Sequence, residues 1–175
     1  MPNRNLPLLI SVARLLKPLL DELVFVGGCV TGVLINDPAA AEVRPTYDVD
    51  AIAEISSYAE YAALSERLRK LGFAEDHSEG APICRWLHGK LKLDVMPTDE
   101  KILGFSNRWY KAAMDSSEEI KLEKDLIIRV ARAPYFLATK LEAFKGRGKN
   151  DYLASHDLED LMAVIQANSR NPVEA

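Results

Sequence analysis

The chain has 175 residues, of which 48% are hydrophobic, and a formal net charge of −4. This length predicts one domain with a core of its own, and the acidic balance excludes a broadly basic nucleic-acid-binding protein while leaving room for a local basic patch. No apolar run approaches the roughly 18 residues that a membrane span needs, and two cysteines without metal-ligand spacing favour a reducing compartment. We therefore expect a cytoplasmic protein that has no membrane partner.

The first part of the chain predicts a helix, a strand and a glycine turn. Apolar residues at helical spacing predict an amphipathic helix over residues 6–22, bent or ended by an internal proline. The strand Leu23–Val26 follows, and Gly27-Gly28 then lets the backbone turn sharply and approach a ligand, because glycine has no Cβ. Cys29–Ile35 is expected to be a short helix whose N–H groups face a triphosphate. Without acidic residues downstream, the same pattern would be an ordinary strand-to-helix turn.

Two aspartates occupy the next predicted strand. Asp48 and Asp50 point to one face of this strand and Val49 to the other, because strand side chains alternate. At about 6–7 Å apart the two carboxylates repel each other unless a cation lies between them, and hard oxygen ligands of this kind suit Mg²⁺. Arg44 precedes the pair and is positioned to balance its charge or to contact a nucleotide. The alternatives are a polar edge strand with solvated acids and a plain surface arginine.

A third acid lies in a predicted hairpin over Ile83–Met96, which turns at His88-Gly89-Lys90. Asp94 is placed inside the apolar second arm of this hairpin, where a carboxylate needs a partner or a metal. If this arm neighbours the strand of Asp48 and Asp50, the three acids converge.

The rest of the chain predicts further helices and one more hairpin. The expected elements are a helix over 57–71, a hairpin over 119–131, a helix over 134–147 and a last helix from 153 to about 166. Lys140, Phe144 and Arg147 share one face of the helix predicted over 134–147, and this face could line a nucleotide pocket. The alternative is a solvated basic face. The glycine-flanked turn that carries Lys145, Arg147 and Lys149 is a candidate contact for RNA phosphates.

The order of these motifs resembles a known family. Gly-Gly after a strand, Asp-x-Asp on the next strand and a single Asp on a later one are similar to the nucleotidyltransferase fold shared with DNA polymerase beta, although nineteen residues separate Gly28 from Asp48, more than in the usual pattern. The segment KLEAFKGRGKNDYLASHDLEDL resembles the signature of the AbiEii/AbiGii toxin family. The resemblance covers residues 24 to about 165. It implies an α+β nucleotidyltransferase fold, a mixed twisted sheet flanked by helices, with a core over 1–133 and C-terminal helices over 134–170 in one compact domain.

The resemblance also implies roles for individual residues. The metal ligands for Mg²⁺ or Mn²⁺ are Asp48, Asp50 and Asp94, and an NTP is the co-substrate. Catalytic roles fall on these three acids, on Lys140 at the triphosphate and on Asp157, for which Asp151 and Asp160 are alternatives. Nucleotide-binding roles fall on Gly27, Gly28, Thr31, Arg44, Lys140 and Arg147.

The function that the resemblance implies is metal-dependent nucleotidyl transfer from an NTP to tRNA or another RNA. The protein would then be the toxin-like component of a type IV toxin–antitoxin system, with a cognate antitoxin as partner. Two alternatives stay open: transfer to a small molecule such as an antibiotic hydroxyl, and a catalytically silent module that binds a nucleotide or a partner.

Overall fold

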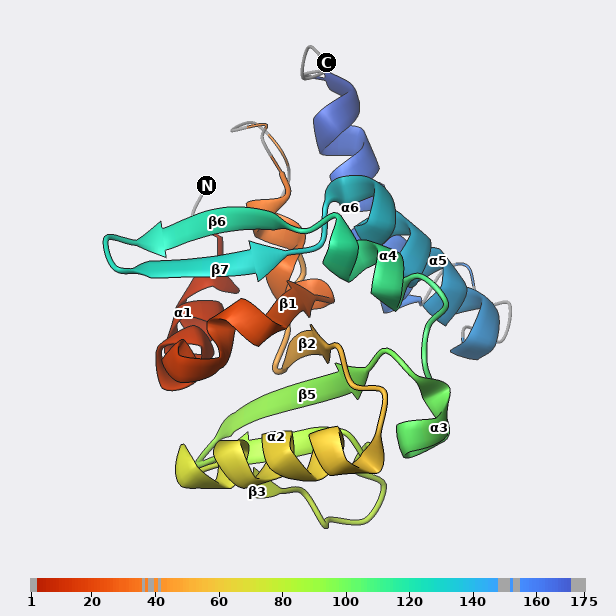
Figure 1. Cartoon of the computed structure of the whole chain (residues 1–175). Helices are drawn as coiled ribbons and strands as arrows, with labels where there is room; N and C mark the ends of the chain where they lie inside the picture. The colour runs from red at the N-terminus through yellow and green to blue at the C-terminus, as the bar shows by residue number, and fades with distance from the viewer. Residues whose placement is uncertain are drawn as a thin grey trace.

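A computed structural model describes residues 3–35, 37, 40, 42–147, 152 and 155–170, the side chains of residues 147 and 170 excepted. Figure 1 shows the chain from the N-terminus in red to the C-terminus in blue. The elements in chain order are α1 (Leu6–Leu15), the 3-10 helix η1 (Lys17–Glu22), β1 (Leu23–Val26), the 3-10 helix η2 (Gly28–Val33), β2 (Val49–Ala53), α2 (Tyr58–Lys70), β3 (Ala74–Glu75), β4 (Arg85–His88), β5 (Leu91–Pro97), α3 (Glu100–Leu103), α4 (Tyr110–Asp115), β6 (Glu118–Glu123), β7 (Leu126–Val130), α5 (Ala133–Arg147) and α6 (His156–Arg170).

The strands of the described residues form one mixed seven-stranded sheet in the order β3-β4-β5-β2-β1-β7-β6. β2 runs antiparallel to β1 and parallel to β5, and β1 runs parallel to β7. The hairpins β4–β5 and β6–β7 add antiparallel pairs on either side. The predicted α+β class with a mixed sheet is confirmed, and β2, which carries the candidate acids, has paired strands on both sides.

The N-terminal helix is shorter than predicted. The α-helix ends at Leu15, and residues Lys17–Glu22 continue as a 3-10 helix, so the helical stretch predicted over 6–22 is divided near its internal proline, as the prediction included. The reason is Pro18, which has no N–H to donate and whose ring clashes with the carbonyl one turn earlier. α1 still buries an apolar face formed by Leu9, Val12 and Ala13.

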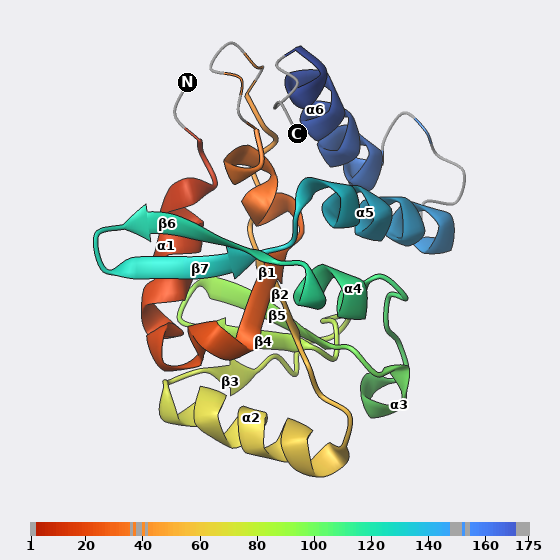
Figure 2. The ribbon, with the colours of Figure 1, turned by 45° about the horizontal axis from the view of Figure 1, so that its top comes forward.

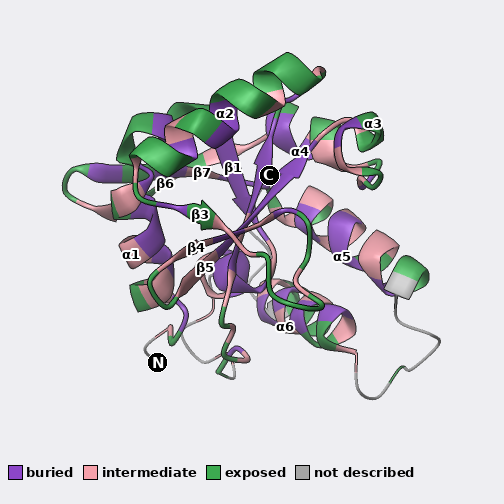
Figure 3. Ribbon diagram, turned by 90° about the horizontal axis from the view of Figure 1, so that it is seen from below, coloured by how far each residue is buried: buried purple, intermediate pink, exposed green. Residues whose placement is uncertain are grey.

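The helix predicted over residues 57–71 is confirmed as α2, Tyr58–Lys70. Ser57 and Glu60 form a capping box: the Ser57 side chain accepts the Glu60 N–H, and the Glu60 carboxylate accepts the Ser57 N–H. Gly72 follows the C-terminus with φ of 87°, which allows the chain to leave the helix sharply. α2 presents a largely exposed outer face, shown in green in Figure 3, and buries Leu64 and Leu68.

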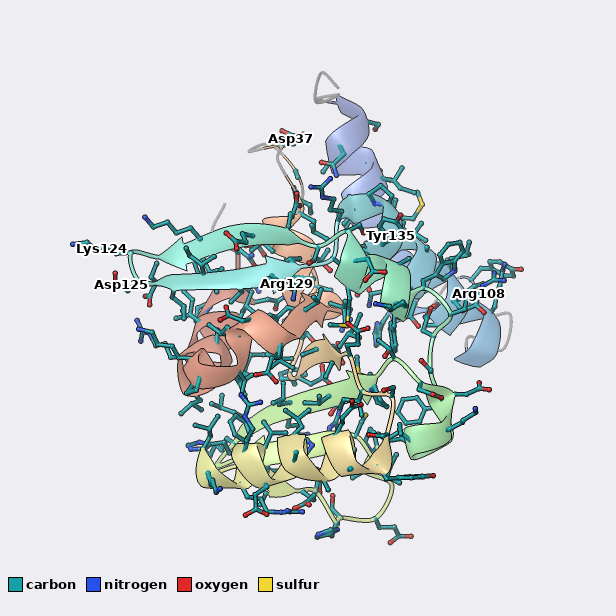
Figure 4. The ribbon with its side chains drawn as sticks, in the orientation of Figure 1. Asp37, Arg108, Lys124, Asp125, Arg129 and Tyr135 are labelled. Atoms are coloured by element: carbon teal, nitrogen blue, oxygen red, sulfur yellow. The ribbon has the colours of Figure 1, made fainter. Side chains whose placement is uncertain are left out.

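Both predicted hairpins are confirmed. β4 and β5 pair from Arg85 opposite Asp94 to His88 opposite Leu91, with the turn at residues 89–90. β6 and β7 turn at Lys124 and Asp125, which lie at the tip of the hairpin in Figure 4. The first hairpin therefore fixes the position of Asp94 next to β2.

Two helices close one end of the molecule. Figure 2 shows α5 and α6 side by side beyond the end of β7. α6 begins at His156 and runs to Arg170, so its predicted limits of 153 and about 166 are displaced toward the C-terminus; residues 153 and 154 lie outside the described part. Asn168 of α6 donates to the Leu34 carbonyl just after η2 (3.3 Å), which ties the helix to the glycine-turn region. Among the described helices, none is both long and apolar enough to cross a membrane.

Candidate active site

The glycine turn after β1 packs directly against an acidic side chain of β2. Gly27 has φ 73° and ψ −167°, a region that is essentially restricted to glycine. The register of β1 and β2 pairs Val26 with Asp50, which brings the Asp50 carboxylate over Gly27. A Cβ on Gly27 would lie 1.8 Å from Asp50 Oδ2. The absence of a side chain at Gly27 therefore makes the space that the Asp50 carboxylate occupies.

The segment after the turn differs from the prediction. The short helix expected over Cys29–Ile35 is a six-residue 3-10 helix over Gly28–Val33. Thr31 is fully buried in it, and its hydroxyl has no hydrogen-bond partner among the described residues. The geometry therefore gives no support to a contact between Thr31 and a triphosphate.

The three candidate acids come together in the centre of the sheet. Asp48 lies just before β2, one residue outside the strand in which it was predicted, and Asp50 lies within β2. The parallel register of β2 and β5 places Asp50 directly beside Asp94. Val49, between the first two acids, is fully buried, as the predicted alternation requires. The convergence expected from the sequence is thus present in the backbone register.

Arg85 of β4 joins two of these acids. Its Nε and Nη2 donate to the two carboxylate oxygens of Asp94, each at 2.8 Å, and Nη2 also donates to Asp48 Oδ2 at 2.8 Å. The hydrogen bonds to Asp94 raise the pKa of Arg85 above its usual value, so the guanidinium is charged at every accessible pH. Within the described residues, no three His, Cys, Asp or Glu side chains form a cluster that could hold a metal ion. Arg85 was not singled out from the sequence.

Lys140 of α5 is buried against two carboxylates of α6. Its Nζ donates to Asp160 Oδ2 at 2.7 Å and to Asp157 Oδ1 at 3.3 Å. The side chains of all three residues are at most 9% exposed. A solvated basic face at Lys140, which was the alternative interpretation of the helix, is therefore wrong. The structure brings both Asp157 and Asp160 into contact with Lys140, and the contact with Asp160 is the shorter one.

Arg44 lies at the same cluster and not between the acids of β2. Its Nη2 is 3.5 Å from Asp160 Oδ2, and its Nε is 3.7 Å from Glu159 Oε2. The positive charge of Arg44 is consequently directed at α6.

A buried asparagine, which the sequence did not reveal, holds the segments that lead to the site. The Asn5 side chain donates to the carbonyls of Arg44 (2.9 Å) and Gly28 (3.3 Å) and accepts the Thr46 N–H (3.0 Å). Thr46 in turn donates its hydroxyl to Asp48 Oδ1 at 2.9 Å. No local pattern signals this role, since the partners of Asn5 lie 23 to 41 residues away in sequence.

A cavity of about 230 Å³ lies between the sheet and the C-terminal helices. Its lining residues are Val26, Gly27, Asp50, Pro82, Cys84, Asp94, Met96, Phe105, Asn107, Tyr110, Thr139, Lys140, Ala143 and Asp157. The cavity thus joins the acids of β2 and β5 to the lysine–aspartate cluster of α5 and α6. Burial raises the pKa of the Cys84 thiol to about 12, so this side chain is uncharged at neutral pH.

Some predicted site residues cannot be placed. Lys149 and Asp151 lie outside the described residues, and of Arg147 only the backbone, at the end of α5, is described. Lys145, in contrast, is exposed near the end of α5.

Gly27→Ala should lower the free energy of unfolding by about 2–4 kcal/mol, because the new Cβ displaces the Asp50 carboxylate and the backbone is strained. The matched control is Gly80→Ala, which also has a positive φ (78°) but no heavy atom within 4 Å of the added Cβ, and should cost only about 1–2 kcal/mol. Urea unfolding of both variants measures the difference. Equal losses would show that the contact with Asp50 does not constrain the turn.

Comparison with known proteins supports the fold. No protein-family model and no curated protein sequence matches the chain. Among solved structures, the chain is similar to an antigenic nucleotidyltransferase-like protein from Paracoccidioides brasiliensis, with a TM-score of 0.61 and 17% identity over 93% of this chain and 76% of that one. It is also similar to the antibiotic-resistance factor ANT(2'')-Ia, with a TM-score of 0.58 and 12% identity over 95% of this chain and 85% of that one. The chain has the fold of nucleotidyltransferase-like proteins.

Proposed function

We propose that this protein is a metal-dependent nucleotidyltransferase, which moves a nucleotide from an NTP to an acceptor. The observation that carries the proposal is the placement of Asp50 beside Asp94, over a glycine turn, at a cavity that Lys140 also lines. The fold it shares with nucleotidyltransferase-like proteins supports the same general reaction.

The chemistry of the acidic side chains fits a divalent cation. Asp48 and Asp50 offer hard carboxylate oxygens, and the missing Cβ of Gly27 leaves space for the Asp50 carboxylate beside the cavity. Asp48 and Asp50, with Asp94 beside them, would hold Mg²⁺ or Mn²⁺. When bound, such an ion supplies positive charge that neutralises the phosphates and the leaving pyrophosphate.

The cluster on the C-terminal helices has a complementary role. Lys140 provides a positive charge on the wall of the cavity, where it would face the triphosphate, and Asp157 and Asp160 hold its ammonium group in place. Asp157 also lines the cavity, and there it would orient the acceptor hydroxyl or take its proton. Positioning of this kind accounts for most of the catalysis in phosphoryl transfer.

The first candidate acceptor is tRNA or another RNA. It rests on the resemblance of residues 140–161 to the AbiEii/AbiGii signature and on the basic turn at the end of α5, of which Lys145 is exposed. With this acceptor the protein would act as the toxin-like component of a type IV toxin–antitoxin system.

The second candidate acceptor is a small cationic molecule that carries a hydroxyl, such as an antibiotic. The observation that favours it is the charge of the cavity lining, which contains Asp50, Asp94 and Asp157 against the single lysine Lys140. ANT(2'')-Ia, an antibiotic-resistance factor, has the same fold.

Incubation with each α-labelled NTP and Mg²⁺ tests the proposal, once with total cellular RNA and once with a set of aminoglycosides. We expect label in a macromolecular or small-molecule product that depends on Mg²⁺ and on Asp50. If no NTP and no acceptor gives a labelled product while the folded protein also fails to bind NTP, the proposal is wrong.

Neutralising the basic turn separates the two acceptors. If the acceptor is RNA, Lys145→Ala/Arg147→Ala/Lys149→Ala should weaken RNA binding and flatten its salt dependence by a slope of about 0.7–0.9 for each phosphate that the protein no longer neutralises. NTP affinity should survive, because Asp50 and Lys140 are unchanged. The matched control is Lys121→Ala/Lys124→Ala/Lys92→Ala on the sheet hairpins. Turnover of a small cation that is unchanged or faster in the first variant would contradict the RNA acceptor.

A further inference from the structure

We propose that Asn5 is a positioning residue of the active site. It joins the glycine turn to the segment that leads into β2, and through Thr46 it fixes the Asp48 carboxylate. Asn5 lies outside the stretch from 24 to about 165 that resembles the nucleotidyltransferase families. The inference rests on the proposed function, because it concerns the same site, but its test includes a measurement that does not depend on nucleotidyl transfer.

The side chain of Asn5 is not used by its own helix. Asn5 stands at the N-cap of α1, where an asparagine usually accepts an N–H of the first helical turn. Among the described residues of this turn it makes no such bond. The Leu6 N–H donates to the Asn3 carbonyl at 3.1 Å, and Pro7 has no N–H to donate. Capping of α1 therefore does not account for a polar residue that is 1% exposed.

The hydrogen bonds of Asn5 go instead to two segments of the site. Its amide group donates to the carbonyls of Gly28 (3.3 Å) and Arg44 (2.9 Å), and its side-chain oxygen accepts the Thr46 N–H (3.0 Å). A buried polar group that loses a partner costs free energy, so these bonds resist separation of the two segments. One buried amide thus holds the glycine turn against residues 44–46.

Thr46 connects this segment to an acid of the site. Its hydroxyl donates to Asp48 Oδ1 at 2.9 Å, while Arg85 of β4 donates to the other oxygen, Oδ2, at 2.8 Å. The Asp48 carboxylate is therefore oriented from both sides. Because a hydrogen bond weakens steeply away from its preferred distance and angle, the Thr46 hydroxyl can orient Asp48 only while its own backbone is held in place. Asn5 supplies that hold.

The surroundings of Gly28 show that three parts of the site meet beside Asn5. A Cβ on Gly28 would lie 3.4 Å from each of three polar groups: the Arg44 guanidinium, the Thr46 hydroxyl and the Asp160 carboxylate. The glycine turn, the 44–46 segment and α6 therefore lie close together at this point. A displacement of the segment would reach α6 as well as the sheet.

Steady-state transfer by folded Thr46 variants tests the catalytic consequence. Thr46→Val keeps the shape and removes the hydroxyl, so kcat should fall by about ten- to a hundredfold with the KM for NTP within about threefold of wild type, because a small misplacement near the chemistry is costly. Thr46→Ser restores the hydroxyl and should recover kcat to within about threefold of wild type. A merely structural role would lower the stability of Thr46→Val and leave kcat of the folded protein unchanged.

The matched control is Thr98→Val. It makes the same change at a half-buried threonine just after β5 and should leave kcat and KM unchanged.

Asn5→Ala removes all three bonds at once and should lower kcat at least as much as Thr46→Val. When Thr46→Val is added to Asn5→Ala, the further loss should be less than about threefold, because the hydroxyl is no longer held toward Asp48. Losses that multiply as independent effects, or a kcat of folded Asn5→Ala within about threefold of wild type, would overturn the role of Asn5. If Asn5→Ala does not fold, an unchanged kcat in Thr46→Val would still overturn it, and a loss that Thr46→Ser restores would support it.

Hydrogen exchange gives a readout that needs no NTP. The Thr46 N–H donates to Asn5, so it should exchange at least about tenfold faster in Asn5→Ala than in the wild type. The reference is the Val95 N–H, which donates to the Cys84 carbonyl at 2.9 Å and should stay protected in the folded variant. An unchanged exchange rate at Thr46 would contradict the inference whether or not the protein transfers nucleotides.

The two readouts separate this inference from the proposed function. Faster exchange at Thr46 in Asn5→Ala, with no nucleotidyl transfer by the wild type, would contradict the proposed function and leave the coupling of Asn5 to Thr46 in place. Transfer by the wild type, with an unchanged kcat in folded Asn5→Ala, would contradict the inference alone.

Discussion

Replacing both Asp48 and Asp50 by asparagine is expected to lower Mg²⁺-dependent nucleotidyl transfer by at least about a thousandfold, because metal ions contribute several kcal/mol of transition-state stabilisation. The fold should survive, because asparagine has nearly the same shape and Arg85 keeps its two hydrogen bonds to Asp94. The free energy of unfolding should change by less than about 1 kcal/mol.

The matched control for this variant is Asp115→Asn, an exposed acid at the end of α4, which should leave transfer and stability unchanged. Activity and urea unfolding need to be measured on the same preparations. If the double variant retains activity, the metal assignment is wrong, and if it unfolds, the two acids have a structural role.

Lys140→Met should lower the free energy of unfolding by about 3–5 kcal/mol, because it leaves Asp157 and Asp160 buried without their cation. The sequence alone suggests a much smaller effect, since its pattern predicts a flexible charge on a helix face at Lys140. The buried ion pair changes this expectation. NTP affinity should fall as well, and it should be measured at a temperature at which the variant is folded.

Two further variants isolate the cause. Lys145→Met, on the same helix but exposed, should cost less than about 0.5 kcal/mol. The triple variant Lys140→Met/Asp157→Asn/Asp160→Asn should recover most of the stability that Lys140→Met removes, because no unpaired charge remains buried. If Lys140→Met is as stable as the wild type and loses only NTP affinity, the contacts with α6 contribute nothing to folding.

Much of the sheet could be predicted because its determinants are local. The alternation around Val49 and the turn at Gly89 and Lys90 define which side chains share a strand face. Asp50 and Asp94 lie in largely apolar strands, where a carboxylate needs a hydrogen-bonding or charged partner. That the strand of Asp94 neighbours the strand of Asp50 was only a condition at the level of the sequence, and the structure meets it by placing β2 between β1 and β5. The helix limits were less accurate, since Pro18 and the glycines permit 3-10 geometry, which the apolar spacing does not distinguish from an α-helix.

The partners of the polar residues were harder to predict. Arg85 lies opposite Asp94 because the hairpin turns at Gly89 and Lys90 alone, whereas the predicted turn at His88-Gly89-Lys90 does not give this register. The partners of Asn5 could not be predicted, because it bonds to segments distant in sequence, whose approach depends on how α1 packs on the sheet. The burial of Lys140 likewise depends on the docking of α5 against α6, and Lys140 alone would have suggested a solvated charge.

The central claim, transfer of a nucleotidyl group, is tested most directly by following both ends of the NTP. The protein should be incubated with Mg²⁺, the acceptor and an NTP labelled at either the α- or the γ-phosphate. We predict that the α-label enters the acceptor while the γ-label is released as pyrophosphate in equal amount, and that both signals disappear in the Asp48→Asn/Asp50→Asn variant. Entry of the γ-label into the acceptor, or release of the γ-label as inorganic phosphate with no α-label in any acceptor, would contradict the account.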